Sequence, residues 1–198
     1  LKREKYVAQI EKNVKNLVVI LNDFLSLSKL EEGKIKVSLE QFDFIHFVKM
    51  MIRETKFSLK HNQNINFTTS EDQLMVQLDT KLLRHVIANL LSNASKYSAE
   101  NTSIDLKITT DYKTVRIEIT DQGIGIPNEE QKNLFQRFFR AKNALNIEGT
   151  GLGLNIVKQY VELMKGSISL KSELNNGSNF IVELPINHKK NYEKNTNY

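Results

Sequence analysis

The chain has 198 residues, of which 40% are hydrophobic and 26% charged, a composition that indicates a globular protein and excludes a disordered or fibrous one. It has no cysteine, which excludes disulfides and thiolate metal sites. No stretch approaches about 18 consecutive apolar residues and no basic-then-apolar leader opens the chain, so we expect no membrane contact in this fragment. The net charge of +5 suits a phosphate-bearing ligand, an acidic partner or nucleic acid, so charge alone does not decide among them.

The first 32 residues are predicted to form one long helix, and because the sequence starts at leucine we expect a piece cut from a longer protein. Apolar residues recur at alternating spacings of three and four, which is a heptad seam, and further apolar positions widen it into a stripe typical of a helix bundle. The seam is Val7, Ile10, Val14, Leu17, Leu21 and Phe24, widened by Val18, Leu25 and Leu30. Such a helix is about 45 Å long, so its stripe requires helices from outside the chain or a second copy. A helix packed on its own domain is the alternative.

Beyond Gly33, which can end this helix, strands and helices are both predicted. The expected strands are residues 34–40, 65–69, 74–78, 103–110, 114–120, 167–172 and 179–184, the last two forming a hairpin turned at 175–177. The expected helices are residues 42–61, 79–97 with Asp79 as N-cap, a short helix opened by Pro127 and Asn128 with Gln131 as capping-box partner, and 153–161.

Strands and helices are segregated along the sequence more than they alternate, which favours an α+β fold. We expect a two-layer α/β sandwich, with helices on one face of a mixed sheet, preceded by the long N-terminal bundle helix. The predicted divisions are residues 1–33 for that helix, an incomplete unit, residues 34–186 for the main domain, and residues 187–198 for a polar, disordered tail.

Four short clusters contain the residues that could bind a ligand or take part in a reaction. The first cluster lies on the predicted helix 79–97. Asn89, Asn93, Lys96 and Tyr97 are spaced so that two amides, an ammonium group and an aromatic ring share one helix face. An Asn side-chain oxygen can complete a magnesium shell filled mainly by phosphate and water oxygens. Asn is a mediocre helix former, so two Asn in the middle of a helix suggest a functional reason. An ordinary solvent-exposed helix face would, however, show a similar pattern of residues.

The second cluster is Asp121 with Gly123 and Gly125, at the end of a predicted strand. A carboxylate there can accept a hydrogen bond from the exocyclic amine of adenine, whereas guanine presents a carbonyl that it would repel. The two glycines would let the backbone approach a flat ligand closely. An Asp-initiated turn before Pro127 is the structural alternative.

The other two clusters are residues 135–140, with three Phe and two Arg, and residues 149–154, which contain three Gly. The glycine-rich turn enters a helix whose N-terminus favours phosphate oxygens, although it matches neither the Walker loop nor the dinucleotide fingerprint. The Phe-Arg cluster precedes a polar stretch, 142–148, and is consistent with a movable lid that carries cations for a polyphosphate. A short core helix with surface Arg is the alternative for the Phe-Arg cluster.

In this order the four clusters resemble the N, G1, F and G2 boxes of sensor histidine kinases, and residues 21–34 resemble the second helix of that family's dimerisation and histidine-phosphotransfer hairpin. The resemblance implies a magnesium-ATP site in which Asn93 ligates the metal with Asn89 as its support, Lys96 and Arg140 contact phosphate, Tyr97 stacks on adenine and Asp121 reads it. The implied ATP-binding residues are Asn89, Asn93, Lys96, Tyr97, Asp121, Gly123, Gly125, Arg137, Arg140, Gly149, Thr150, Gly151, Leu152 and Gly153.

The histidines depart from the family pattern, in which a phosphoacceptor His precedes an acidic residue. No histidine of this chain does so, as the following residues show for His46, His61, His85 and His188. We therefore expect the acceptor on a helix missing from this fragment. The implied function is transfer of the ATP γ-phosphoryl group to that histidine for signalling to the receiver domain of a response regulator. The resemblance also implies a homodimer through the N-terminal helix and a cytoplasmic location, with membrane anchoring of the full-length protein left open.

Two other function classes remain as alternatives. An ATP hydrolase of the same fold would need a carboxylate general base one helical turn before the metal-binding Asn93, where this chain has Asn89. A basic coiled-coil module that binds nucleic acid would explain the first helix and the charge but would leave the four clusters without a role, so we expect no nucleic-acid partner.

Overall fold

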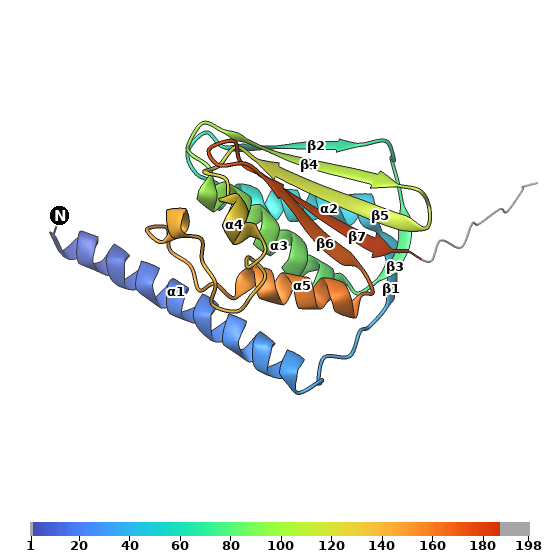
Figure 1. Ribbon diagram of the computed structural model, residues 1–198, viewed down its shortest axis with the longest axis horizontal. Coiled ribbons are helices and arrows are strands. Elements are labelled where there is room, and N and C mark those ends of the chain that lie inside the picture. The colour runs from blue at the N-terminus through green and yellow to red at the C-terminus, as the bar shows by residue number, and fades with distance from the viewer. Residues whose placement is uncertain (1, 187–198) are drawn as a thin grey trace, which may run out of the picture.

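The computed structural model describes residues 2–186, and the predicted disordered tail 187–198 lies outside these described residues (Figure 1). A long helix, α1, precedes a body of strands and shorter helices. In chain order the elements are α1 (Lys2–Glu31), β1 (Glu40–Asp43), α2 (Phe44–Lys56), β2 (Asn64–Thr69), β3 (Met75–Leu78), α3 (Thr80–Tyr97), β4 (Ser103–Thr110), β5 (Thr114–Asp121), α4 (Asn128–Gln131), a 3-10 turn (Lys142–Ala144), α5 (Gly153–Leu163), β6 (Ser167–Ser172) and β7 (Ser178–Pro185).

Five strands form one mixed sheet in the order β2-β4-β5-β7-β6, and β1 and β3 form a separate antiparallel pair. The pair β2–β4 is parallel, and the other neighbours in the large sheet are antiparallel. Figure 1 shows α2, α3 and α5 together on one face of this sheet. The expected α+β sandwich, with a mixed sheet and helices on one face, is therefore confirmed.

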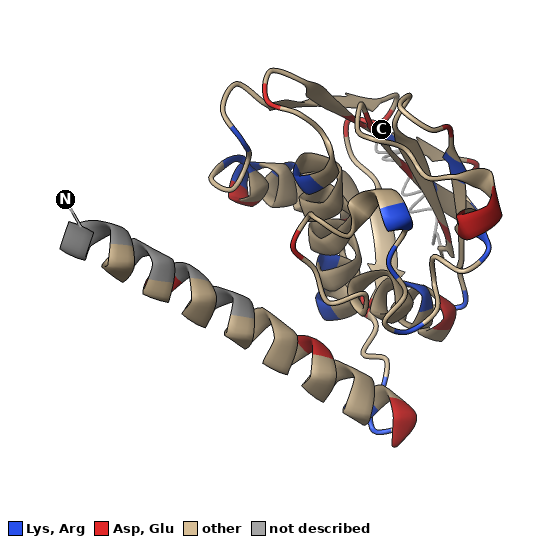
Figure 2. Ribbon diagram, turned by 60° about the vertical axis from the view of Figure 1, so that its left-hand side comes forward, with Lys and Arg blue, Asp and Glu red and all other residues tan. Residues whose placement is uncertain are grey.

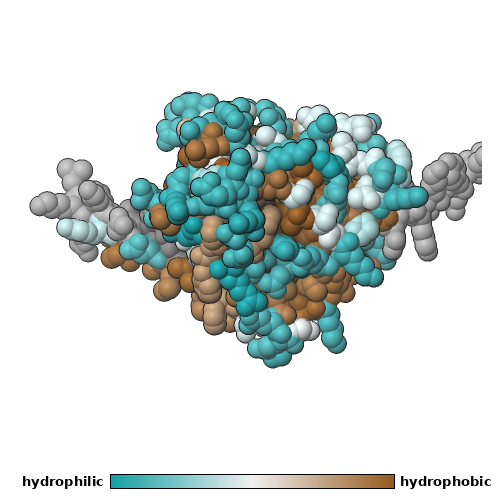
Figure 3. Space-filling view, viewed as in Figure 1, coloured by the Kyte–Doolittle hydropathy of each residue, from teal (hydrophilic) through white to brown (hydrophobic). Residues whose placement is uncertain are grey.

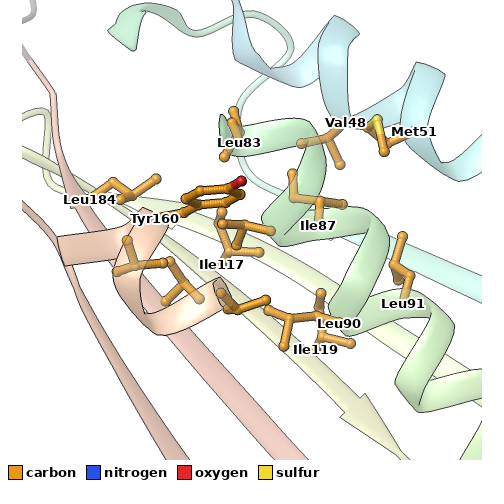
Figure 4. Packing of buried hydrophobic residues seen from close by; sticks show 14 of the residues in the cluster. Val48, Met51, Leu83, Ile87, Leu90, Leu91, Ile117, Ile119, Tyr160 and Leu184 are labelled. Carbon is orange, nitrogen blue, oxygen red and sulfur yellow. The ribbon is translucent and has the colours of Figure 1, made fainter. Parts of the chain in front are cut away.

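The core lies between that helix layer and the sheet, and α3 runs through its middle (Figure 4). One face of α3 presents Leu83, Ile87, Leu90 and Leu91, all nearly inaccessible to solvent, toward the buried side chains of β5 and the neighbouring helices. Burying an aliphatic side chain of this size contributes about 1.5–3 kcal/mol. Burial of this face orients the whole helix, so the opposite face of α3, with Asn89 and Asn93, has a defined position.

The helix starts and turns of the body largely follow the sequence. The predicted N-cap of α3 is confirmed, because Asp79 Oδ1 accepts hydrogen bonds from the backbone N–H groups of Lys81 (2.9 Å) and Leu82 (3.0 Å). The predicted hairpin of β6 and β7 is also confirmed, with Asn175 and Gly177 at positive φ in its turn.

Two predictions before β2 were wrong. Residues 34–39 form no strand; the strand begins at Glu40, and the backbone N–H of Ser38 donates instead to Asp79 Oδ2 (2.8 Å). The apparent alternation reflects Ile35, which packs against the core between exposed neighbours. The helix predicted at 42–61 covers only Phe44–Lys56, because Asp43 caps its first turn at Ile45 and the chain then leaves the helix in turns.

The capping box predicted for the short helix α4 was also wrong. Pro127 is the N-cap residue and makes no side-chain capping bond. The amide of Gln131 donates to Asn128 Oδ1 (3.0 Å) and to the carbonyl oxygens of Ile126 and Ser172 (both 2.9 Å). Gln131 therefore ties this helix to the β6–β7 hairpin, a partner that is distant in sequence.

Helix α1 stands at the side of the body, and Figure 2 shows its N-terminal half extending away from it. Near its C-terminal end Leu27 is buried against the core, whereas the predicted seam is exposed to solvent, with 61% of Ile10 and 65% of Leu17 accessible. Figure 3 shows apolar residues at the surface along this helix. In the described part of the chain the heptad seam therefore has no covering helix. No helix within residues 2–186 has the length and apolarity needed to cross a membrane.

Candidate functional site

A pocket of about 560 Å³ lies between α3, the end of β5, the segment before α5, and α1. It collects most of the residues that the sequence singles out. Those that line it are Asn89, Asn93, Lys96, Tyr97, Asp121, Gly125, Arg140, Gly149, Thr150, Gly151 and Gly153. Four clusters separated by up to 64 residues in sequence thus form one cavity.

The wall formed by α3 is organised by contacts among its own side chains. Asn93 Nδ2 donates to Asn89 Oδ1 (2.9 Å), one helical turn earlier, which leaves Asn93 Oδ1 as an acceptor for a ligand. Lys96 Nζ lies 4.5 Å from the centre of the Tyr97 ring, a cation-π contact that holds the ammonium group at the pocket. The wall therefore offers an amide oxygen, a positive charge and an aromatic ring.

Asp121 is buried at the end of β5, and its Oδ1 accepts hydrogen bonds from the backbone N–H groups of Gly123 (2.8 Å) and Ser178 (3.3 Å). Burial raises the pKa of Asp121 to about 6, although these two N–H groups act to lower it. With Oδ1 engaged by the protein, Oδ2 is the acceptor that remains for a ligand.

The two glycines after Asp121 are constrained by close contacts within the protein itself. A Cβ on Gly123 would lie 2.7 Å from both Asp121 Oδ1 and the carbonyl oxygen of Tyr97. Gly125 has a φ of +61°, and a Cβ there would overlap the carbonyl oxygen of Glu173 in the β6–β7 hairpin. Both positions therefore require glycine because other atoms of the protein come this close, and the approach of a flat ligand to them stays a prediction.

The segment between α4 and α5 closes the pocket opposite α3. Arg140 Nη2 donates to the carbonyl oxygens of Ala144 (2.7 Å), Leu145 (3.0 Å) and Ile147, so its guanidinium group organises this loop. The buried Glu130 accepts a hydrogen bond from the backbone N–H of Lys142 (2.9 Å). Arg140 also lines the pocket, and its contact with phosphate and the movement of the lid stay predictions.

Three predicted residues lie outside the lining of the pocket. Arg137 forms an ion pair with Glu31 at the end of α1, where both side chains are largely exposed. Leu152 is a buried core residue, and the backbone N–H of Gly123 donates a hydrogen bond to Asp121 Oδ1. The motifs include these residues, but a motif does not specify which of its members face the pocket.

Residues of α1 complete the pocket, which the sequence analysis did not anticipate. Val19, Ile20 and Asp23 line it, and Asp23 Oδ2 accepts a hydrogen bond from Thr150 Oγ1 (3.0 Å). Burial raises the pKa of Asp23, while the Thr150 hydroxyl and the charge of His85 act to lower it. No periodicity signal marks Asp23, because a heptad pattern describes the seam of a helix and not the surface on which its other face docks.

The described residues contain no group of three or more His, Asp or Glu side chains that could hold a metal by themselves. A hard cation in this pocket would take most of its ligands from phosphate and water oxygens, with an amide oxygen from the protein. Asn93 Oδ1 is of that type and has no partner from the described chain. The residues present therefore fit a magnesium ion that enters together with a polyphosphate.

The sheet, its single helix layer and this pocket define a nucleotide-binding domain of the class in which a helix, a strand end and a glycine-rich helix entrance enclose the ligand. The chain belongs to the family of histidine kinase-, DNA gyrase B- and HSP90-like ATPases, whose family model matches residues 78–188. Within this family, the chain contains the ATP-binding catalytic domain of the type found in sensor histidine kinases.

Similar proteins support this assignment. Histidine kinase P4 of Formosa agariphila is 32% identical over 189 residues, covering 92% of this chain but only 14% of the relative's length. A full-length ShkA structure in complex with AMPPNP aligns with a TM-score of 0.80 at 24% identity, over 94% of this chain and 39% of that one. The structure of histidine kinase ThkA, solved in complex with the response regulator protein TrrA, aligns with a TM-score of 0.74 at 24% identity. The alignment covers 92% of this chain and 51% of that one. The two structures show a common fold.

Proposed function

We propose that this domain binds magnesium-ATP in the pocket and donates the γ-phosphoryl group to a histidine on a helix outside the chain. The observation that carries the proposal is the convergence of the Asn89–Asn93 pair, Asp121 and the glycine-rich segment 149–153 on one cavity. These groups are complementary to magnesium-ATP: the amide pair suits the metal, the carboxylate suits the adenine base, and the backbone N–H groups of the glycine-rich segment suit the phosphates.

Selection of adenine is assigned to Asp121. Two backbone N–H groups hold Oδ1, so Oδ2 is available to accept from the exocyclic amine of adenine. Guanine has a carbonyl at that position, and two acceptors facing each other in a buried site would repel. Tyr97, which lines the same pocket, is proposed to stack on the base.

The triphosphate is assigned to the other side of the cavity. Asn93 would ligate magnesium, supported by Asn89, while Lys96 and Arg140 would neutralise phosphate charge. When bound, magnesium would supply positive charge that neutralises the phosphate groups. In phosphoryl transfer the protein mainly positions the reactants and stabilises charge, which is what these side chains can do.

An acceptor from outside the chain is supported by the positions of the histidines. Of the three in the described residues, none lines the pocket, and His85 packs edge-on against Tyr160 with ring centres 5.6 Å apart. His188 lies outside the described residues. Water is a weak substitute as nucleophile because position 89 offers an amide in place of a general base, which disfavours the hydrolase alternative.

The N-terminal helix is assigned to dimerisation. We infer a division into residues 1–33, part of a dimerisation and phosphotransfer hairpin, and residues 34–186, the catalytic domain. The exposed seam of α1 supports self-association, which we expect to be weak because half of each hairpin is missing. A receiver domain of a response regulator is the proposed second partner, in keeping with the ThkA–TrrA complex.

Titration calorimetry with ATP and GTP, with and without magnesium, tests the binding proposal. We expect ATP to bind, GTP to bind much more weakly and magnesium to strengthen ATP binding. Incubation with radiolabelled ATP should leave no acid-labile label on this chain, whereas a longer, lid-defective version carrying the missing helix should become labelled in trans through mixed dimers. Label on any of the four histidines would contradict the proposed acceptor, and rapid phosphate release by the isolated chain would favour the hydrolase.

A further inference from the structure

The buried side chain of Gln63, in the segment between α2 and β2, makes most of its hydrogen bonds to the C-terminal end of α3 and the residues that follow it. Its Nε2 donates to the carbonyl oxygens of Ser95 (3.1 Å) and Ala99 (2.8 Å). Its Oε1 accepts from Ser95 Oγ (2.6 Å) and from the backbone N–H of Lys60 (3.1 Å). A buried amide is costly unless all its groups are paired, and this amide is paired with one helix end.

Lys60, three residues earlier, holds the same helix end. Its Nζ donates to the carbonyl oxygens of Lys96 (2.8 Å) and Ser98 (2.6 Å). The last four carbonyl groups of a helix have no partner inside the helix, and a positive charge at this end interacts favourably with the helix dipole. Lys60 and Gln63 together, here called the brace, thus bind four carbonyl groups at the end of α3.

The final turn of α3 lies between the brace and the nucleotide pocket. Lys96 and Tyr97 line the pocket from this turn. On its other side, the carbonyl oxygen of Tyr97 accepts from the backbone N–H of Ile124 (3.3 Å), and Ser98 forms a β-bridge with Gly123. A shift of this turn would therefore move the aromatic ring, the ammonium group and the loop beside Asp121 together.

We propose that Lys60 and Gln63 are positioning residues of the nucleotide site, which act through the last turn of α3 to hold Lys96 and Tyr97 in their binding geometry. The proposal rests on ATP binding in this pocket. Neither brace residue lines the pocket, so each acts on the ligand only through the helix. The geometry favours this role over general stabilisation because all the carbonyl bonds of the brace converge on the segment 95–99.

Calorimetric titration with magnesium-ATP tests the brace in Gln63→Ala and Lys60→Met, at a temperature where circular dichroism shows each variant fully folded. We expect each to weaken ATP binding about fivefold, the effect of losing hydrogen bonds of ordinary strength. Lys60→Arg should restore nearly normal affinity, since a guanidinium group can donate to both carbonyls. Lys56→Met is the matched control, because it removes the same charge from the exposed end of α2, and it should bind as wild type does.

A double-mutant cycle distinguishes positioning from a structural role. In a Tyr97→Ala, Lys96→Ala background the brace can act only through the backbone contacts to the loop beside Asp121, so adding Gln63→Ala should change ATP affinity by about twofold at most. The full fivefold loss in that background, or normal affinity of a folded Gln63→Ala protein, would overturn the brace. Failure of the wild-type chain to bind ATP would overturn the proposed function instead.

Discussion

The two glycine-rich segments beside the pocket are held in different ways. Residues 122–126 are fixed largely through backbone groups, with Ile124 bonded to both Tyr97 and Asn175 and the N–H of Ile126 donating to Ser172 Oγ. Residues 149–153 meet α1 through a side-chain contact, the bond from Thr150 to Asp23. The proposed base side of the pocket, here called the fixed side, is therefore held within the body, whereas the proposed phosphate side meets α1 through a side-chain contact.

The largest effect should come from breaking the fixed side with Gly125→Ala. The added Cβ would overlap the carbonyl oxygen of Glu173 at a positive φ, so we expect a loss of more than 3 kcal/mol in the free energy of unfolding by urea. Gly33→Ala is the matched control, since Gly33 has the same φ of +61° but nothing within 4 Å of the new Cβ. It should cost only about 1–2 kcal/mol. Equal losses would refute the close-approach explanation.

Asp121→Asn tests base selection on the same fixed side. An amide can keep one acceptor toward the Gly123 and Ser178 N–H groups, but it then presents an NH₂ donor to the amine of adenine. We expect ATP affinity in calorimetry to fall by about 1.5–3 kcal/mol, roughly ten- to hundredfold. Unchanged affinity would contradict the assignment of Asp121.

Asn93→Ala tests the phosphate side. Because the amide oxygen is proposed as a metal ligand and not as a base contact, ATP affinity in the presence of magnesium should fall by on the order of tenfold. Affinity measured in EDTA should change much less. Equal losses under both conditions would argue against metal ligation.

The pH dependence of ATP binding gives a further test of the fixed side. Burial raises the pKa of Asp121 to about 6, and the proposed bond to adenine uses the charged form, so affinity should fall by at most about tenfold per pH unit below pH 6. The folded protein without ligand behaves oppositely: the raised pKa means that the contribution of Asp121 to stability decreases as pH rises from 3.8 to 6. Asp121→Asn should flatten this part of the binding profile.

The smallest effect is expected for Arg137→Ala. Its ion pair with Glu31 is more than 40% exposed on both sides, and such pairs contribute about 0–1 kcal/mol. Because Arg137 does not line the pocket, ATP affinity should stay within twofold of wild type. A larger loss would indicate that the lid rearranges on binding so that Arg137 reaches the phosphates, as the motif resemblance implied.

Local rules predicted what local contacts determine. The period of the apolar residues predicted that Leu83 and Ile87 are buried and therefore which face of α3 carries Asn89. Asp79 was recognisable from the sequence as the N-cap of α3. The role of Gly125 was not readable, because its constraint comes from Glu173, 48 residues away. Asp23 was missed for the same reason: its place in the pocket depends on how α1 docks on the body.

Asp79 joins two functions in one carboxylate: Oδ1 caps α3, and Oδ2 holds the backbone of Ser38. Between that anchor and the end of α1 the chain has only residues 32–37, six residues that span roughly 20 Å when fully extended. This short connection limits how far the body can move from the end of α1. If α1 stays in a helix bundle while the body swings, the body can turn widely but stays close to the end of α1, so the histidine proposed as its acceptor must lie within reach of a pivot at the start of α3.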